Sequence, residues 1–383
     1  MNDLIDVPAG LNGVAVADTT IGTVQGDEGF YHYREHDATE LARAVGFEDA
    51  WFLLERGMLP EGGEREAFRA AVAAERVVPD GLHGLVDVVA GLELSPLAKL
   101  RTILSAAPSA LGLAPMLDLD DDDRRTQARR MAAIVPAVLG RLHRAAAGLP
   151  AIEPDPDLGH AAAYLYEVTG ERPSDAHARA VEQYLMLTID HGFNASTFTG
   201  RVVASTGADI ADVVCAAIGA LAGPLHGGAP SRALDALDAI GSPDRAADWV
   251  RREVAAGRRI MGFGHAVYRA PDPRSALLRE VAGGLGGELV DRAVAVETEI
   301  LTTLAELKPD RPLPSNVEFY AGVIMETVGL PRSMFTPTFA VSRTVGWVTH
   351  AVEQAAAGKL IRPAARYVGP APHRSVRAGE LVG

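Results

Sequence analysis

Apolar residues recur at helical spacing along most of this 383-residue chain, and proline or glycine interrupts them at short intervals. Between positions 38 and 55, for example, Leu41 and Ala44 precede Trp51 and Leu54. A helix with one apolar face must bury that face against other elements. Only short stretches near the ends have the alternation that is typical of strands. The sequence therefore predicts a mainly α fold with minor β structure at the termini.

The same periodicity and its breaks predict where the helices lie. We expect them over residues 38–55, 64–77, 82–92, 95–107, 124–143, 159–169, 174–191, 194–205, 209–222, 230–240, 246–256, 272–282, 288–307, 315–328 and 338–358. Four aspartates at 120–123 directly precede one of these helices. Because acids in a first turn complement the helix dipole, we favour a helix cap there over a metal site.

Composition limits the kinds of partner. The formal net charge of −14 argues against non-specific nucleic-acid binding. Cys215 is the only cysteine, which excludes a disulfide within the chain and fits a reducing cytoplasm. The N-terminus has no signal-peptide pattern, and the longest apolar run, 213–225, is too short to span a bilayer. We predict a cytoplasmic protein without a membrane or nucleic-acid partner.

A glycine-rich break interrupts the helical pattern at Gly223-Pro-Leu-His226-Gly-Gly. Glycines allow a tight turn and the close approach of a ligand. If His226 lies at the start of the next helix, the helix dipole disfavours its charged form. A neutral imidazole can still donate a hydrogen bond to a carbonyl group. The alternative is a histidine that only caps a helix.

A second polar segment, Gly262-Phe-Gly-His265-Ala-Val-Tyr-Arg269-Ala-Pro-Asp-Pro-Arg274, places two arginines near one histidine. Guanidinium groups bind carboxylates and phosphates through paired hydrogen bonds, so the segment suits an anionic substrate. The alternative is a polar loop that ends in a helix start at Asp272 and Pro273.

A third polar segment, Pro314-Ser-Asn-Val-Glu318, has two interpretations. Ser315 and Glu318 stand at the spacing of a capping box, which needs no function beyond starting a helix. Glu318 can equally be a catalytic carboxylate. Its spacing alone favours the cap, whereas the two polar segments before it favour the carboxylate.

Taken together, these segments resemble those of a known protein family. In this order, GPLHGGA, GFGHAVYRAPDPR and NVEFYAG resemble the three active-site segments of citrate synthases, which condense oxaloacetate with an acyl-CoA. Residues 190–198, 342–350 and the pair Arg362-Pro363 also resemble that family, so the similarity spans nearly the whole chain. The resemblance implies a two-domain helical fold. Residues 1–225 and 336–383 would form a large domain, and 226–335 a small domain that closes over the acyl-CoA side of a cleft.

The resemblance also implies roles for individual residues. Glu318 would remove a proton from the acyl group, His226 would donate a hydrogen bond to the thioester oxygen, and His265 would polarise the ketone of oxaloacetate. The carboxylates of oxaloacetate would be held by His191, Arg274, Arg343 and Arg362, the last reaching across from the partner chain of a homodimer. Coenzyme A would contact Arg269, Met261, Gly262, Gly264 and Arg311, with Lys308 a further candidate for its phosphates. The resemblance implies no metal and no permanently bound cofactor.

The chain departs from the family pattern at the proposed base. Most citrate synthases carry aspartate where this chain has Glu318, although a branch of shorter paralogues has Asn-Val-Glu. The extra methylene moves the carboxylate by roughly an ångström, and such a shift can cost about a hundredfold in rate. A pseudoenzyme that binds CoA or a dicarboxylate therefore stays open, as does a lyase acting on citryl-CoA. Acetyl-CoA and propionyl-CoA differ by one methyl, worth about 1–3 kcal/mol, so 2-methylcitrate synthase stays open too.

Overall fold

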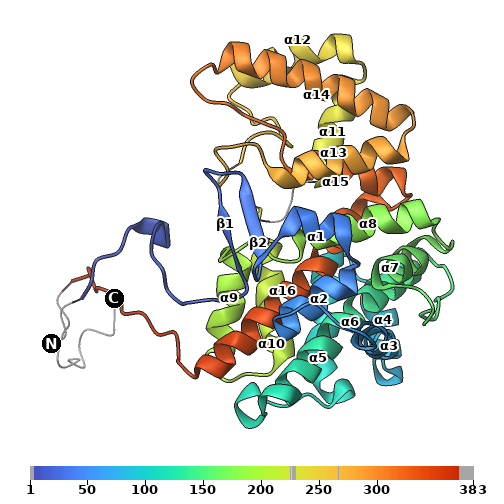
Figure 1. Cartoon of the computed structure of the whole chain (residues 1–383), viewed down its shortest axis with the longest axis vertical. Coiled ribbons are helices and arrows are strands. Elements are labelled where there is room, and N and C mark those ends of the chain that lie inside the picture. The colour runs from blue at the N-terminus through green and yellow to red at the C-terminus, as the bar shows by residue number, and fades with distance from the viewer. Residues whose placement is uncertain (1–3, 225, 227–229, 266, 371–383) are drawn as a thin grey trace, which may run out of the picture.

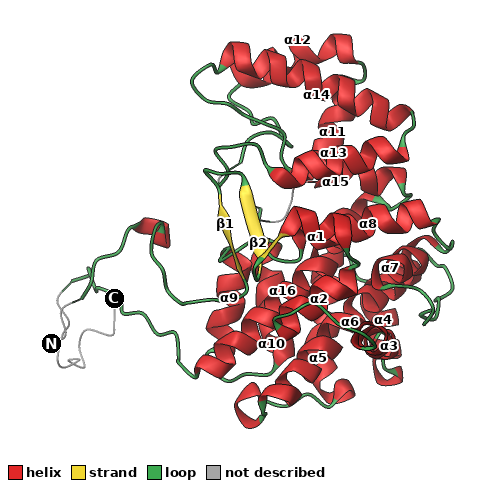
Figure 2. Ribbon diagram, viewed as in Figure 1, coloured by secondary structure: helices red, strands yellow, loops and turns green. Residues whose placement is uncertain are grey.

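The computed structural model describes residues 4–224, 226, 230–265 and 267–370, and its regular secondary structure is mostly helical (Figures 1 and 2). The α-helices are α1 (Ala38–Ala44), α2 (Phe47–Arg56), α3 (Glu64–Glu75), α4 (Asp80–Ala90), α5 (Pro96–Leu111), α6 (Asp121–Ala146), α7 (His160–Thr169), α8 (Asp175–Thr188), α9 (Ala195–Ala204), α10 (Ile210–Leu221), α11 (Pro230–Ile240), α12 (Ala246–Ala255), α13 (Pro273–Leu285), α14 (Glu288–Leu307), α15 (Val317–Thr327) and α16 (Phe335–Ala357). The predicted mainly α fold is confirmed.

The β structure is one small antiparallel sheet near the N-terminus. Its strands are β1 (Gly22–Gln25), β2 (Phe30–Tyr33) and β3 (His36–Asp37), in that order. Residues 359–370, the described part of the other terminus, run without a strand. Both terminal segments leave the body on the same side (Figure 1), and Arg366 Nη2 lies 2.7 Å from Asp6 Oδ1.

The helix predicted over 38–55 is two helices, because contacts from distant residues break it. The side chain of Arg179 donates to the carbonyl of Val45 at 2.9 Å. The backbone N–H of Phe47, the first residue of α2, donates to Glu182 Oε1 at 3.0 Å. Both partners lie on α8, so a local apolar pattern could not reveal the break.

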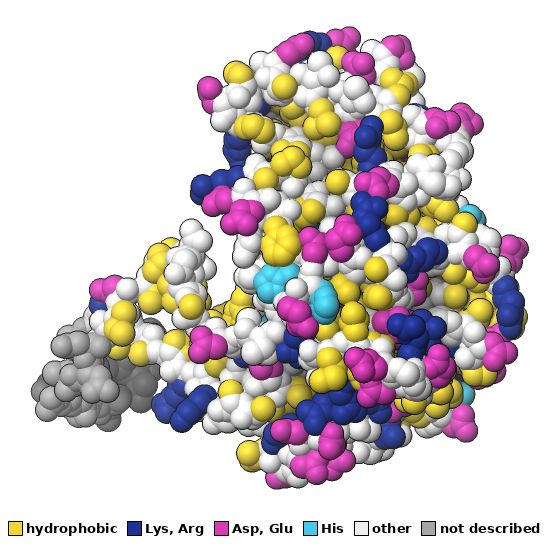
Figure 3. All heavy atoms as spheres, viewed as in Figure 1, with side chains coloured by type: hydrophobic (Ala, Val, Ile, Leu, Met, Phe, Trp, Pro, Cys, Tyr) yellow, Lys and Arg dark blue, Asp and Glu magenta, His cyan; other side chains and the backbone are white. Residues whose placement is uncertain are grey.

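The aspartate run begins a helix, as expected. Asp120 Oδ1 accepts a hydrogen bond from the backbone N–H of Asp123 at 2.9 Å and so caps α6. Arg125 pairs with Asp122 at 2.8 Å one turn along. Acidic and basic side chains are interspersed in this way over the face that Figure 3 shows. The helix-cap interpretation is confirmed.

The central element of the body is α16, which packs against α6, α8, α9 and α10. Its apolar side chains are buried on all sides, and Trp347 is among the largest of them. A helix that is apolar all round belongs in the interior of a protein. In this position α16 carries Arg343 and His350 into the middle of the molecule.

A second group of helices, α11 to α15, gathers at the other end of the molecule (Figure 1). Within it α15 packs against α11 and α13, and α12 packs against α14. It meets the body where α8 contacts α13 and α15 and where α11 contacts α16. These helices fall inside the segment 226–335, and the division of the chain into two domains at those boundaries stays a prediction.

The β1–β2 hairpin reaches from the body to this second group. The carbonyl of Gly26 accepts a hydrogen bond from the backbone N–H of Arg269 at 3.1 Å. A Cβ at position 26 would lie 2.3 Å from the carbonyl oxygen of Val267, so only glycine allows this approach. The hairpin thus holds the loop that follows His265.

Among the described residues, the segment Pro96–Asp118 is long and apolar enough to cross a membrane by length and composition. It contains α5, whose side chains Leu100, Ile103 and Leu104 are fully buried against neighbouring helices. A helix with one face in the core of a globular protein passes the same test, and α5 packs in this way against α4, α6 and α10.

Candidate active site

A cavity of about 580 Å³ opens where the loop after α10, the loop before α13 and the start of α15 meet. His226, His265 and Glu318 all line it, so the three segments singled out by sequence converge on one space. Further lining residues from the predicted site are Met261, Gly262, Gly264, Lys308 and Arg311. The cavity is thus large enough for part of a sizeable ligand, and two imidazoles and a carboxyl group line it.

Two segments join to form the wall between His265 and Glu318. The backbone N–H of Gly264 donates to the carbonyl of Pro314 at 2.7 Å, and that of Asn316 donates to Gly262 at 2.9 Å. The side-chain amide of Asn316 adds a bond to the carbonyl of Gly264 at 2.9 Å. Gly264 has φ +78°, and a Cβ there would lie 2.8 Å from Leu313. The glycines of the motif are needed for this pairing.

The capping box predicted from Ser315 and Glu318 is wrong. Asn316 is the N-cap of α15, and its Oδ1 accepts from the backbone N–H of Glu318 at 3.1 Å. Ser315 Oγ instead lies 3.1 Å from Ser275 Oγ on α13. Because Asn316 does the capping, the carboxylate of Glu318 is left to line the cavity.

The carboxyl group of Glu318 is poised near neutrality. Burial raises its pKa to about 7, against the opposing positive charges of Arg274 and Arg232 and with a further contribution from Asp272. A carboxylate in this state exchanges a proton readily at physiological pH, because its two forms are almost equally populated. The environment of Glu318 therefore suits a general base.

His265 is held by its own loop. Its Nδ1 accepts from the backbone N–H groups of Val267 at 2.9 Å and Tyr268 at 3.0 Å. Two backbone donors at Nδ1 place the proton of the neutral ring on Nε2, so the 3.3 Å approach of Arg274 Nη2 to Nε2 brings two N–H donors together and is not a hydrogen bond. Burial and, to a smaller extent, the charge of Arg274 lower the pKa of His265 to about 4, although Asp272 acts in the opposite direction. The ring is neutral at pH 7 and has an Nε2–H to offer a ligand.

Arg274 is fixed by a buried ion pair. Its Nε donates to Asp272 Oδ1 at 3.0 Å and its Nη2 to Oδ2 at 2.9 Å. The guanidinium also lies over the ring of Tyr268, 5.5 Å from its centroid. Asp272 Oδ2 accepts from the backbone N–H of Val317 at 3.3 Å, which ties the start of α13 to that of α15. Sequence reasoning assigned Asp272 only to a helix start and missed this second role.

His226 is hydrogen-bonded to a serine that is not part of the cavity lining. Its Nε2 lies 2.8 Å from Ser196 Oγ, which also accepts a hydrogen bond from Trp347 Nε1 at 3.1 Å. Burial lowers the pKa of His226, and the charge of Arg343 adds to this effect. The expected neutral imidazole is therefore present, although burial and Arg343 are its causes. The glycines at 227 and 228 lie outside the described residues.

His191, Arg274 and Arg343 are not among the residues that line the cavity, and His191 lies beside His265. The ring centroids of His191 and His265 are 5.9 Å apart, and His191 Nε2 lies 3.0 Å from the hydroxyl of Tyr268. Arg343 is only 2% exposed, and its Nε donates to the carbonyl of Thr188 at 2.7 Å. Burial, then the charges of Arg274 and Arg343, hold the pKa of His191 well below its usual range. We call His191, Arg274 and Arg343 the arginine–histidine cluster.

Two further predicted residues, Arg269 and Arg362, lie neither in the cavity lining nor in the arginine–histidine cluster. The side chain of Arg269 is exposed, and its Nε lies 3.4 Å from Asp27 Oδ1. Arg362 is exposed on the segment that leaves the body after α16 (Figure 1). The roles predicted for both residues stay predictions.

Sequence reasoning missed several basic residues that do line the cavity. Arg258 and Arg259 come directly before the Ile260–Gly264 stretch, and Arg232 lines the cavity from α11. We call Arg258, Arg259, Lys308 and Arg311 the basic rim. The adjacent pair Arg258-Arg259 just before the Ile260–Gly264 stretch was the available signal, but nothing in its spacing tells which way the side chains face.

Comparison with known proteins agrees with this geometry. The family model for the C-terminal domain of citrate synthase matches residues 10–364. A citrate synthase of Haloferax volcanii is 37% identical over 95% of this chain and 96% of its own length. A 2-methylcitrate synthase of Mycobacterium tuberculosis is 36% identical over 95% of this chain and 91% of its own.

A solved structure of citrate synthase from Thermoplasma acidophilum, in a ternary complex with carboxymethyl coenzyme A and oxaloacetate, superposes with a TM-score of 0.88. It is 27% identical and covers 98% of this chain and 99% of its own. Sequence and fold thus match along the whole length. The chain belongs to the citrate synthase family of enzymes.

Proposed function

We propose that this enzyme condenses an acyl-CoA, acetyl-CoA in the first instance, with oxaloacetate and water to give citrate and CoA. The observation that carries the proposal is the meeting of His226, His265 and Glu318 in one cavity. A carboxyl group with a pKa of about 7 lines the cavity together with two neutral imidazoles, and the buried guanidinium group of Arg274 lies 3.3 Å from His265 Nε2. These are the parts that enol formation and attack on a ketone require.

Enol formation would use Glu318 and His226. The ionised carboxylate of Glu318 takes a proton from the α-carbon of the acyl group, and the electron pair moves to the thioester oxygen. His226 stabilises that oxygen by donating a hydrogen bond from Nδ1. This tautomer requires Ser196 to donate its hydroxyl proton to Nε2, while the indole N–H of Trp347 bonds the serine oxygen.

Carbon–carbon bond formation would use His265. The α-carbon of the enol attacks the ketone carbon of oxaloacetate, and His265 Nε2–H supplies the proton that the ketone oxygen gains. The proton that Glu318 took from the α-carbon then replaces it on the imidazole, which restores both groups. The arginine–histidine cluster holds the two carboxylates, which suits a dianion because guanidinium groups make paired bonds to carboxylates. Water then cleaves the citryl-CoA thioester and releases CoA as the thiol.

The CoA moiety would extend along the same cavity. The basic rim offers positive charge to its phosphates, and the backbone at 261–264 offers carbonyl and N–H groups to the adenine. Closure of the small domain, 226–335, would exclude water from the acyl-CoA. Arg362 would complete the oxaloacetate site from the partner chain of a homodimer.

A second donor, propionyl-CoA, is the alternative, because relatives of both names match this chain at similar identity. The test mixes purified protein with oxaloacetate and either donor and follows the released thiol. We expect thiol release with acetyl-CoA at the higher kcat/KM. A higher kcat/KM with propionyl-CoA would make the enzyme a 2-methylcitrate synthase, and no release with either donor would overturn both proposals.

A further inference from the structure

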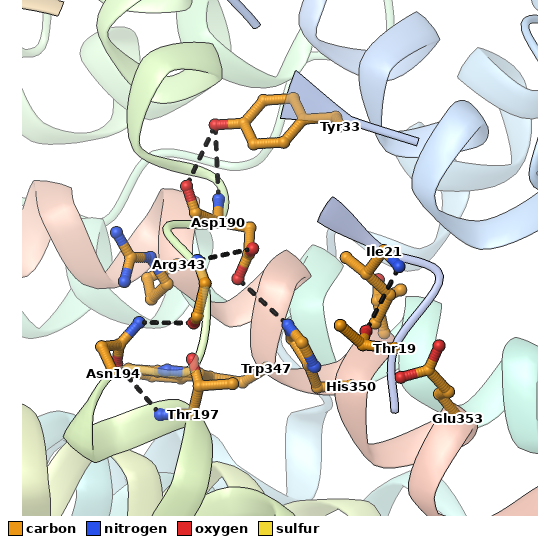
Figure 4. Close-up of polar contacts among 12 residues, drawn as sticks. Thr19, Ile21, Tyr33, Asp190, Asn194, Thr197, Arg343, Trp347, His350 and Glu353 are labelled. Carbon is orange, nitrogen blue, oxygen red and sulfur yellow. Dashed lines mark hydrogen bonds and ion pairs between the residues drawn. The ribbon is translucent and has the colours of Figure 1, made fainter. Parts of the chain in front are cut away.

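A line of buried polar side chains runs from the surface of α16 to the segment that carries His191. It consists of Glu353, Arg201, His350 and Asp190, and we call it the polar chain. Figure 4 shows Asp190 and His350 facing one another, with Glu353 further along the same helix. The side chains of His350 and Asp190 are 1% and 2% exposed. None of these residues lines the cavity or is used in the mechanism above.

The hydrogen bonds fix the state of His350. Arg201 Nη1 can only donate, and it lies 2.9 Å from His350 Nδ1. His350 Nδ1 therefore accepts, and the ring proton is on Nε2. Nε2 then donates to Asp190 Oδ1 at 3.2 Å. Arg201 Nη1 also donates to Glu353 Oε2 at 2.6 Å, so each donor in the line meets an acceptor.

Asp190 connects the polar chain to the arginine–histidine cluster. Its Oδ2 accepts from the backbone N–H of Gly192 at 3.0 Å, so its carboxylate spans the turn that contains His191. Its backbone carbonyl accepts from the hydroxyl of Tyr33 at 3.2 Å (Figure 4). Although burial opposes it, contact with His350 and the nearby charge of Arg343 lower the pKa of Asp190. Asp190 is thus an ionised acceptor held from both sides.

The packing leaves this segment little freedom to move. A Cβ at Gly346, one turn before His350 on α16, would lie 2.2 Å from the carbonyl oxygen of Ile189. The backbone of α16 therefore touches the chain directly before Asp190. A buried charged group such as the carboxylate of Asp190 is seldom needed for stability, because apolar side chains of similar volume often serve as well or better. Asp190 is the residue directly before His191, so the contact between His350 and Asp190 can influence the position of His191.

We propose that His350 is a positioning residue that, through Asp190, sets His191 and Arg343 for the carboxylates of oxaloacetate without touching the substrate. The inference rests on the proposed function, since it assigns oxaloacetate to that cluster. In enzymes, partners behind a liganding histidine fix its tautomer and orientation, and their loss typically weakens ligand binding. His350, acting through Asp190, would fix the orientation of His191 in this way for a substrate carboxylate.

The experiment compares three variants at neighbouring or identical positions. His350→Leu removes both hydrogen bonds, whereas His350→Gln keeps an acceptor for Arg201 and a donor for Asp190. Thr349→Ala is the matched control, because the Thr349 hydroxyl bonds only the carbonyl of Val345 within α16. The readouts are the KM for each substrate, kcat, and the Kd of oxaloacetate by calorimetry. Thermal melts establish that each variant is folded.

We expect His350→Leu to raise the KM and Kd of oxaloacetate about tenfold or more, as for a substrate group displaced by part of an ångström. The KM of the acyl-CoA should stay within about twofold, because the basic rim is remote from the polar chain. His350→Gln should recover most of the oxaloacetate affinity, and Thr349→Ala should match the wild type.

Several results would overturn the inference. These are an unchanged oxaloacetate Kd in His350→Leu, an equal loss for both substrates, and a Gln variant no better than Leu. If the Leu variant does not fold, His350→Asn takes its place, because it stays polar but is too short to reach Asp190. A wild type that binds oxaloacetate without turnover would overturn only the proposed function. One that does not bind it would overturn both.

Discussion

The arginine–histidine cluster and the basic rim are both positively charged, and they are built in opposite ways. Arg274 and Arg343 are 3% and 2% exposed, and each is fixed by named partners. Lys308 and Arg311 are exposed side chains at the cavity edge. A buried charge acts strongly and over a defined geometry, whereas an exposed charge is screened by water and salt.

The difference matches what each region would bind. A small dianion such as oxaloacetate has few contacts, so each must be strong and well placed. A long polyphosphate ligand can use many weak contacts, none of which needs exact placement. We therefore expect substitutions in the cluster to have large effects that salt changes little, and substitutions in the rim to have small effects that salt reduces.

The largest effect is expected where the two regions meet, at Glu318. Glu318→Gln removes the base but keeps the size of the side chain, and general base catalysis contributes roughly a hundredfold to ten-thousandfold. We expect kcat, measured by thiol release, to fall about a thousandfold. The Kd of oxaloacetate should be unchanged, which is the control. Full activity in this variant would remove Glu318 from the mechanism.

Arg274→Met tests the buried side of the comparison. Removal of one partner leaves Asp272 buried and unpaired, at a cost of about 3–5 kcal/mol in the free energy of unfolding. Urea unfolding measures this loss, and the KM of oxaloacetate should rise about a hundredfold.

The double variant Asp272→Asn, Arg274→Met is the control for stability. Asparagine also caps a helix, so most of the stability should return while oxaloacetate binding stays lost. If affinity returns together with stability, Arg274 acts only by holding the fold.

Arg362→Ala asks whether the cluster extends across a dimer. Loss of a charge-assisted bond, worth about 1.5–3 kcal/mol, should raise the KM of oxaloacetate roughly tenfold or more. Mixed dimers of Arg362→Ala and Arg274→Met subunits give the sharper measurement. If Arg362 serves the partner's site, one site in each mixed dimer is intact, and mixing restores activity. No gain on mixing, with subunit exchange shown by mass spectrometry, would place Arg362 outside the partner's site.

The pH dependence follows from the raised pKa of Glu318, about 7. The base works only when ionised, so kcat should fall as the pH drops through about 7. The ionised fraction of one such group changes about tenfold between pH 8 and pH 6. His265, with a pKa of about 4, stays neutral across this range and adds no second step. A flat profile of kcat over this range would contradict the environment described for Glu318.

The smallest effect is expected at the basic rim. Exposed charge contacts are worth about 0.2–1 kcal/mol each, so Lys308→Ala with Arg311→Ala should raise the KM of the acyl-CoA roughly fivefold. Added salt should shrink the difference from the wild type. Arg251→Ala, an exposed arginine of α12 that pairs with Glu306, is the control and should change nothing. An equal rise in the KM of oxaloacetate would contradict the division between the two regions.

The sequence predicted features that depend on local pattern. The helix that follows Asp120 begins with the expected cap, and Gly264 of the second motif has the positive φ that accompanies its pairing with the loop before α15. Prediction from the sequence failed where residues far away in the chain determine the local structure. The break before Phe47 is set by Glu182 on α8, and capping by Asn316 rather than Ser315 depends on how Gly264 pairs with the loop before α15.

The basic residues show the same limit. Arg269 stands inside the motif and yet faces Asp27, whereas Arg258 stands outside it and lines the cavity. Both residues are arginines, and the path of the backbone between α12 and α13 decides which of the two side chains faces the cavity. Charge and spacing alone therefore identify anion-binding candidates without ranking them.

The hydrogen bond from Arg269 to the carbonyl of Gly26 joins the N-terminal hairpin to a loop more than 200 residues later in the chain. Contacts of such large sequence separation form late, because the loop they close costs entropy before any contact offsets it. We therefore expect the loop that contains His265 to reach its final conformation only after most of the polypeptide has been synthesised and packed. A chain interrupted during synthesis would contain most of the body and still have no assembled catalytic centre.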